Sequence, residues 1–227
     1  MELAKPFLDL GMYCADIDAS RAFYEGELGL EYDHLLKVGG GLHQHRLRLV
    51  GAVLKLNSSR TPLPTDAPTC LRSFSLPATT GAPGQQGERF DPDGTRVEVT
   101  PSTTNRPDLI GIEWASRDTD RLTTMLRAGL GAVGSGDDRW TVGSTEIRLI
   151  HDAAAEHAPE GTGFRYLTVQ VFDVRGEHER LCEEGWSEVR PPVRLGDTAA
   201  ISFVRDPDGV LLEVSQRASL TGALPDL

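Results

Sequence analysis

The chain has 227 residues and a formal net charge of −11, with 39% hydrophobic and 25% charged residues. This composition fits a globular protein with a sizeable core, and the acidic balance argues against nucleic acid or an anionic membrane surface as a partner. Three cysteines lie far apart and never form a CxxC pair, which argues against a disulfide framework or a zinc site. The chain shows no signal-like start and no apolar run near the roughly 20 residues of a membrane span, so a cytoplasmic location is expected.

The first half of the chain predicts a unit of the form β-α-β-β-β. Alternating apolar residues from Phe7 to Ala15 indicate a strand whose other face carries Asp9. Asp16 suits the N-cap of a helix that runs from Ile17 to about Leu28. Further strands are expected near Glu31–Lys37, Leu42–Leu49 and Ala52–Asn57.

The last two of these strands form a hairpin whose register the sequence leaves open. A two-residue turn at Val50-Gly51 would place Arg46 and Lys55 on the face opposite the helix. A three-residue turn would move His45 and Leu47 to that face instead.

The middle of the chain departs from this pattern. Residues 58–69 are rich in Pro, Ser and Thr and predict a linker, whereas Leu71–Leu76 suits a short strand. Pro77–Gln86 is too rich in Gly and Pro for an ordinary helix, so this second unit is interpreted as eroded. The boundary between the two halves is expected within Pro101–Pro107.

The second half restarts the pattern. A strand at Leu109–Ser116 leads to a helix that Asp118 caps, and a short hairpin of Trp140–Val142 and Glu146–Ile150 follows. A further strand, a helix and two strands are expected at Phe164–Phe172, Glu177–Glu184, Ser187–Arg194 and Ala199–Val204.

One motif occurs in both halves: Asp-Pro-Asp-Gly followed by a strand, at residues 91–99 and again at 206–214. Asp, Pro and Gly suit successive positions of a tight turn. In both copies a Glu follows the turn glycine by four residues, so Glu98 and Glu213 are expected at equivalent places on a strand, opposite its apolar face. The repeat indicates an internal duplication.

The β-α-β-β-β unit, the helix that ends in FYEGELGL, and DPDGxxxEV together resemble the vicinal oxygen chelate superfamily. This superfamily includes glyoxalases, extradiol dioxygenases, fosfomycin and bleomycin resistance proteins and methylmalonyl-CoA epimerases. The resemblance implies an α+β fold in which repeated β-α-β-β-β modules form two cupped mixed sheets, with a divalent metal in the cup. We expect two paired-module domains, at residues 1–105, with the second module eroded, and 106–227.

The resemblance also implies where metal ligands would lie. Its first-strand positions fall on Asp9, Gly111 and Tyr166, and its last-strand positions on Lys55, Glu98, Arg148 and Glu213. None of these first-strand residues is His, and protonated Lys and Arg cannot ligate a metal. We therefore expect no tight metal in the usual position. The cofactor stays unknown, and a divalent metal could still bind at an atypical site that uses Asp9 or the His43/His45 pair.

If each half forms one cup, the candidate site is the second one. Glu213 would be the general base or an atypical ligand, Tyr166 a proton donor or hydrogen-bonding anchor, and Arg148 the group that stabilises a developing oxyanion. The candidate substrate-binding residues are Glu113, Asp9, Lys55, Glu98 and Arg46. A structural alternative is that Lys55 and Arg148 form ion pairs with Glu98 and Glu213 in place of a lost metal.

The function that the resemblance implies is a glyoxalase-like or dioxygenase-like enzyme. It would act on a small anionic, phenolic or enolic molecule by isomerisation, elimination or ring opening, as a monomer or homodimer. The main alternative is a non-enzymatic protein that binds or sequesters a drug or metabolite. A third hypothesis is a partner-binding scaffold whose cups are filled and vestigial.

Overall fold

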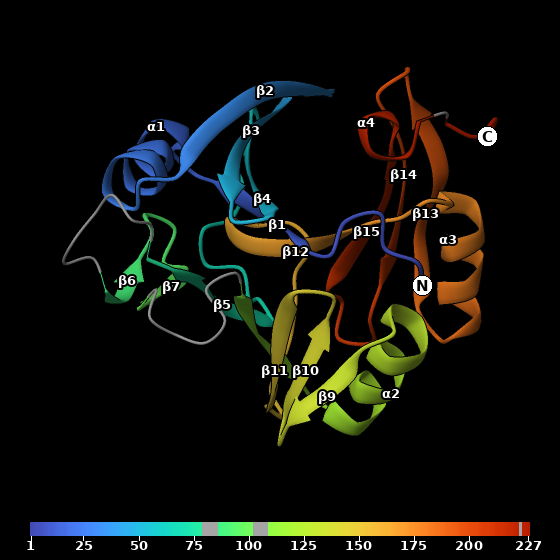
Figure 1. Cartoon of the computed structure of the whole chain (residues 1–227). Coiled ribbons are helices and arrows are strands. Elements are labelled where there is room, and N and C mark those ends of the chain that lie inside the picture. The colour runs from blue at the N-terminus through green and yellow to red at the C-terminus, as the bar shows by residue number, and fades with distance from the viewer. Residues whose placement is uncertain (79–85, 102–108, 223) are drawn as a thin grey trace.

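The computed structural model describes residues 1–78, 86–101, 109–222 and 224–227, and its strands form two mixed sheets (Figure 1). The strands of the larger sheet are β1 (Asp9–Cys14), β2 (Glu31–Gly39), β3 (Leu42–Leu49), β4 (Ala52–Ser59), β12 (Gly163–Gln170), β13 (Ser187–Leu195), β14 (Ala199–Arg205) and β15 (Leu211–Arg217). The strands of the smaller sheet are β5 (Leu71–Pro77), β6 (Gly87–Phe90), β7 (Arg96–Thr100), β8 (Ile110–Ser116), β9 (Val133–Gly136), β10 (Arg139–Val142) and β11 (Thr145–His151). Together with the helices, they confirm the predicted α+β class.

Helices follow the first strands of three modules. They are α1 (Ile17–Arg21), continued as the π-helix η1 (Ala22–Glu27), then α2 (Thr119–Leu130) and α3 (Val174–Glu183). A short helix, α4 (Ala218–Thr221), follows β15 near the end of the chain. Each of the first three begins at an aspartate whose carboxylate accepts hydrogen bonds from backbone amides: Asp16, Asp118 and Asp173. The helix predicted to reach Leu28 ends in a π-turn, in which the Leu28 amide donates to the Phe23 carbonyl.

The order of the strands corrects one prediction about how modules combine. The larger sheet runs β13-β14-β15-β12-β1-β4-β3-β2 and the smaller one β6-β7-β5-β8-β11-β10-β9. The first module therefore joins the fourth, through antiparallel β1 and β12, and the second joins the third, through β5 and β8. The prediction that each half of the chain forms its own cup is wrong, because periodicity within a strand carries no information about which distant strand pairs with its edge. The predicted boundary near residue 105 lies outside the described residues, as does most of the irregular segment 77–86.

Two exposed strands were not predicted. These are β6 and β9, and neither carries the apolar alternation by which the other strands are recognised. The hairpin of β3 and β4 has the two-residue turn, since Leu49 pairs with Ala52 across Val50-Gly51. Arg46 then pairs with Lys55 on the concave face.

The repeated DPDG turns hold each half of the chain together. Asp91 accepts hydrogen bonds from the Thr95 amide (2.7 Å) and from the Tyr24 hydroxyl (2.8 Å), and Asp93 accepts one from the Ala15 amide at the end of β1 (3.1 Å). In the second copy, Asp208 accepts hydrogen bonds from Ser116 and Arg117 at the end of β8. Because the two modules of one half lie in different sheets, each turn links one sheet to the other.

Apolar packing joins the sheets as well. Phe74 on β5 lies 6.4 Å from the ring of Tyr24 and 5.8 Å from that of Phe164 on β12, centroid to centroid. One continuous cluster of buried apolar residues includes side chains of both sheets. Helix α1 packs on β4, α2 on β8 and β11, and α3 on β13 to β15, which leaves the opposite faces of the sheets open. No helix in the described part of the chain is long and apolar enough to cross a membrane.

Candidate active site

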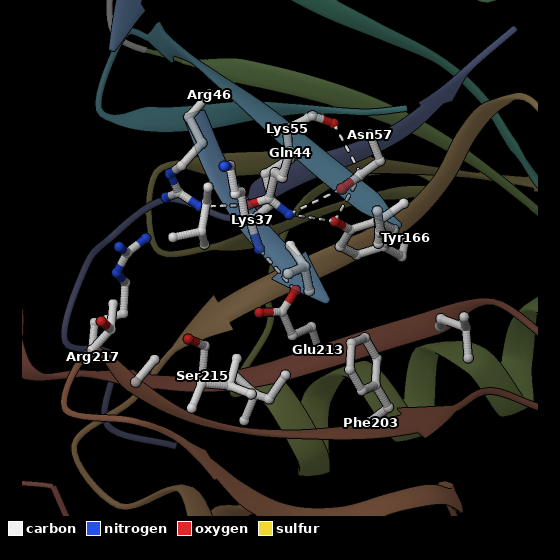
Figure 2. Close-up of a pocket in the computed structure, with 18 of the residues that line it drawn as sticks. Lys37, Gln44, Arg46, Lys55, Asn57, Tyr166, Phe203, Glu213, Ser215 and Arg217 are labelled. Atoms are coloured by element: carbon white, nitrogen blue, oxygen red, sulfur yellow. Dashed lines mark hydrogen bonds and ion pairs between the residues drawn. The ribbon is translucent and has the colours of Figure 1, made fainter. Parts of the chain in front are cut away.

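The cup of the larger sheet contains a pocket of about 370 Å³ (Figure 2). Its walls come from β1 to β4 of the first module and from β12 to β15 of the fourth, so neither half of the chain builds it alone. Apolar side chains, including Leu36, Leu42, Ile201 and Phe203, line much of the wall. The polar and charged residues that line it are Lys37, Gln44, Arg46, Lys55, Asn57, Gln170, Thr198, Glu213, Ser215 and Arg217, with the phenols of Tyr13 and Tyr166.

A buried ion pair lies in this pocket. Lys55 is 2% exposed and Glu213 is 8% exposed. The Lys55 Nζ donates to Glu213 Oε2 at 2.8 Å and to Thr168 Oγ1 at 2.7 Å. Burial lowers the pKa of Lys55, whereas the charges of Glu213 and Asp9 act to raise it. An ammonium has three donors, so one N–H of Lys55 is left over from these two bonds, and the described residues offer Glu213 Oε1 no recorded partner.

Tyr166 lies next to this pair as a neutral hydrogen-bond donor. Its hydroxyl oxygen accepts from Asn57 Nδ2 (3.1 Å) and from Gln44 Nε2 (3.3 Å), and the described residues offer no recorded acceptor for its proton. Burial and the nearby Glu213 carboxylate raise the pKa of Tyr166 well above its usual value. The ring is accommodated by Gly11, where a Cβ atom would lie 2.2 Å from a Tyr166 ring carbon.

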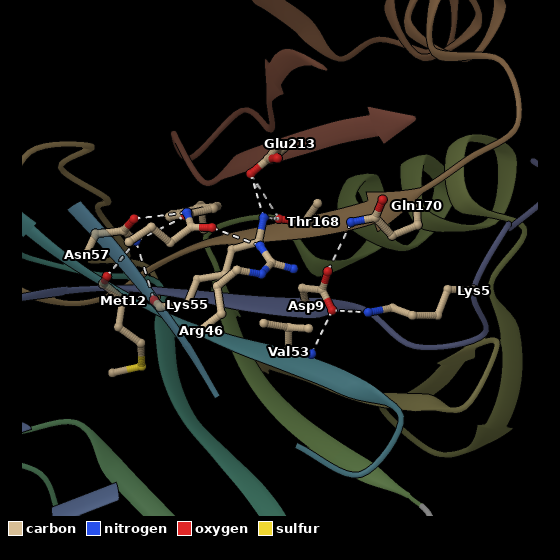
Figure 3. Close-up of polar contacts among 12 residues, drawn as sticks. Lys5, Asp9, Met12, Arg46, Val53, Lys55, Asn57, Thr168, Gln170 and Glu213 are labelled. Carbon is tan, nitrogen blue, oxygen red and sulfur yellow. Dashed lines mark hydrogen bonds and ion pairs between the residues drawn. The ribbon is translucent and has the colours of Figure 1, made fainter. Parts of the chain in front are cut away.

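Asp9 lies in the same sheet but does not line the pocket, which corrects its predicted contact with a ligand. Its carboxylate is fully buried and accepts hydrogen bonds from Lys5, from the Val53 amide (2.7 Å) and from Gln170 Nε2 (3.0 Å) (Figure 3). Burial alone would raise the pKa of Asp9, but the positive charges of Lys5 and Lys55 outweigh it and lower the pKa. Asp9 therefore orients Gln170 and offsets part of the positive charge of Lys55 without lining the pocket itself.

Arg148, Glu113 and Glu98 lie in the other cup. The Arg148 Nη1 donates to Glu113 Oε1 at 3.1 Å, and Glu113 also binds Arg96 and accepts from Ser73 Oγ at 2.7 Å. This cup holds a space of only about 90 Å³, and its arginines are paired with carboxylates. The predicted grouping of Arg148 with Tyr166 and Glu213 is therefore wrong, because these residues lie on different sheets.

The equivalence of the two DPDG glutamates is confirmed. Glu213 pairs in parallel register with Thr168 of β12, and Glu98 pairs in the same way with Ser75 of β5. Each lines the concave side of its own sheet. Their surroundings differ, since Glu213 is buried against Lys55 whereas Glu98 is exposed.

The donor set of the larger cup does not suit a divalent metal. Of the positions that the family resemblance implied, the structure brings Asp9, Lys55, Tyr166 and Glu213 into one sheet. The Lys55 ammonium occupies one of these positions and binds the carboxylate of another, and Tyr166 stays protonated. The described residues contain no group of three or more His, Cys, Asp and Glu side chains placed to hold a metal. His45 instead lies against Tyr32, with its Nδ1 3.4 Å from the phenol oxygen.

Several residues that line or support the pocket were missed by sequence reasoning, although a signal existed for each. Gln44 shares a strand face with Arg46, Thr168 shares one with Tyr166, and Arg217 shares one with Glu213. Gly11 stands inside a strand, where glycine often marks the close approach of another group. Asn57 ends the predicted hairpin, and only its alternation with Lys55 pointed to the pocket.

Residues 7–214 match the family model of the Glyoxalase/Bleomycin resistance protein/Dioxygenase superfamily. The chain belongs to this superfamily. It is 35% identical over 95 residues to a lactoylglutathione lyase of Neisseria meningitidis, a match that covers 41% of this chain and 66% of the relative. It is 31% identical over 74 residues to a probable lactoylglutathione lyase of Synechocystis, which covers 32% of this chain and 56% of the relative. The chain thus spans less than two thirds of the length of these curated relatives.

The fold is similar to that of glyoxalase I from Zea mays. The TM-score is 0.74 over 92% of each chain, at 14% sequence identity. At this identity the likeness confirms the fold, with its two curled mixed sheets, and leaves the chemistry to be argued from the pocket.

Proposed function

We propose that this superfamily member is an enzyme that moves a proton on a small enolisable molecule, with Glu213 as the base and Lys55 and Tyr166 as the groups that stabilise the enolate. The observation that carries this proposal is the buried Lys55–Glu213 pair in an open pocket. Among the described residues, Glu213 Oε1 and one N–H of the Lys55 ammonium have no recorded hydrogen-bond partner and are available to a ligand. Of the reaction types that the resemblance implies, isomerisation and elimination both begin with removal of a proton from carbon, a step for which these residues supply a base and two hydrogen-bond donors.

In this mechanism Glu213 Oε1 removes a proton from the carbon next to a carbonyl group. The electrons of the broken C–H bond move to the carbonyl oxygen, where the charge is stabilised by the Lys55 ammonium and the Tyr166 phenol. Return of the proton to a neighbouring atom completes an isomerisation, whereas loss of a leaving group from the β-carbon completes an elimination. Both donors lie in a pocket with apolar walls, in which charges interact more strongly than in water.

Hydrogen exchange tests this proposal without knowledge of the product. The protein would be incubated in D2O with a panel of small 2-oxo acids, and replacement of C–H by C–D would be followed by proton NMR. We expect catalysed exchange for at least one compound, and its loss in Glu213→Gln. Exchange that persists in Glu213→Gln would show that Glu213 is not the base.

The second candidate is a non-enzymatic binding protein. The apolar wall favours it, because burial of an apolar ligand surface gives affinity without any chemistry. Saturable binding of panel members with no exchange for any of them would favour this function over the enzyme. The open pocket argues against the third hypothesis, which required filled cups.

A further inference from the structure

Two arginines face each other at one end of the pocket, away from Tyr166 (Figure 2). Arg46 on β3 is 4% exposed, and its Nη1 donates to Gln44 Oε1 at 2.8 Å. Its Nε is buried and has no hydrogen-bond partner among the described residues. Arg217 on β15 is half-buried, and within the described parts of the chain neither guanidinium forms an ion pair with a carboxylate.

The charges around this end of the pocket are unbalanced. Lys37, Arg46, Lys55 and Arg217 line the pocket, whereas Glu213 is the one acidic residue among the described lining residues. Its carboxylate is already bound to Lys55. In the smaller cup, by contrast, the arginines are paired with glutamates. A chain of net charge −11 therefore has a local excess of positive charge in the pocket of its larger cup.

Two facing guanidinium groups repel each other unless an anion lies between them. Burial, and then the charge of Arg46, lower the pKa of Arg217, and they outweigh the carboxylates of Asp9, Glu213 and Asp33, which act to raise it. The unpaired Nε of Arg46 is a buried donor that costs free energy until an acceptor reaches it. A carboxylate or phosphate group would offset the repulsion between the two arginines and accept a hydrogen bond from the Arg46 Nε, because guanidinium groups bind such oxyanions through parallel hydrogen bonds.

We propose that Arg46 and Arg217 form a subsite for an oxyanion group of the ligand, a carboxylate or a phosphate. This inference rests on the proposed function in that it concerns the same pocket, and it narrows the substrate class to anionic molecules. Glu213 and Arg217 lie four residues apart on β15, about 13 Å between Cα atoms at the usual rise per strand residue. The ligand therefore extends along β15, with the anion at the arginine end and its reacting carbon beside Glu213.

Isothermal titration with three small aromatic probes tests the subsite. Benzoate and phenyl phosphate carry the two oxyanions on the same apolar ring, and benzyl alcohol is their neutral counterpart. At constant ionic strength we expect saturable binding of at least one anion and at least tenfold weaker binding of the alcohol. Tighter binding of phenyl phosphate would identify a phosphate subsite, and tighter binding of benzoate a carboxylate subsite.

Two variants decide whether the arginines are responsible. Arg217→Gln should weaken anion binding at least tenfold, whereas Arg48→Gln, which removes an exposed arginine of the same strand as Arg46, should leave it unchanged. The proposal is overturned if neither anion binds saturably, if Arg217→Gln binds as the native protein does, or if Arg48→Gln weakens binding equally. Glu213→Gln should abolish proton exchange yet keep anion binding, so failure of the enzymatic proposal is separable from failure of this one.

Discussion

Replacing Lys55 with Met would leave the Glu213 carboxylate buried without its ammonium partner. Glu213 is 8% exposed, and the hydrogen bond from Lys55 at 2.8 Å is one of two recorded for its Oε2. Removal of one partner of such a buried pair costs about 3–5 kcal/mol, mostly the penalty of the unpaired charge. For a chain of this size, a change of 1 kcal/mol shifts the melting temperature by about 2–4 °C. We therefore expect Lys55→Met to melt about 6–20 °C below the native protein.

Urea unfolding followed by circular dichroism would measure this free energy, and a second substitution would test its cause. Glu213→Gln in the Lys55→Met background removes the unpaired charge and should recover more than half of the lost free energy. Arg148→Met is the matched control, since Arg148 is half-exposed and its pair with Glu113 is worth about 1 kcal/mol or less. A loss below about 1 kcal/mol for Lys55→Met, or a double variant no more stable than the single one, would refute the assignment of a buried, coupled pair.

Further predictions address the packing, the ligand, the charge and the metal. Gly11→Ala should cost about 1–3 kcal/mol in urea unfolding and reduce ligand affinity, because the added Cβ would collide with the Tyr166 ring. Arg148→Met should leave ligand affinity unchanged in calorimetry, and a clear loss of affinity would show that the ligand binds in the smaller cup instead. The pKa of Asp9 is lower in the folded protein than its value of about 4 in the unfolded chain. Its negative charge therefore stabilises the fold at pH values above about 4, and this stabilisation is lost as the pH falls through the pKa of the folded protein. Asp9→Asn should be less stable than the native protein at pH 7, by a margin in unfolding free energy that shrinks in acid. Metal analysis of protein purified without tag or chelator should find no stoichiometric zinc, manganese or iron, and such an ion bound through Glu213 would contradict the role given to Lys55.

Much of the fold follows from local signals in the sequence. The strand alternation, the aspartate caps and the DPDG turns each depend on residues within a few positions of one another, so their physical basis can be recognised without a structure. The face of a strand on which a residue lies can be recognised in the same way. Strand periodicity placed Lys55, Tyr166 and Glu213 opposite the apolar faces of their strands, and the structure confirms this placement. The resemblance to the superfamily rested on these local features.

The composition of the pocket was decided by tertiary structure. Lys55 meets Glu213, and Gly11 meets Tyr166, only because β1 pairs with β12 across more than half of the chain. Nothing in the pattern of either strand specifies that edge-to-edge contact, so grouping by sequence half put Arg148 in the wrong cup. The facing of Arg46 and Arg217 has the same origin, since β3 and β15 come from opposite ends of the chain and meet across one curved sheet. A residue's face is a local property of its strand, whereas its neighbours across the cup depend on long-range strand pairing and sheet curvature.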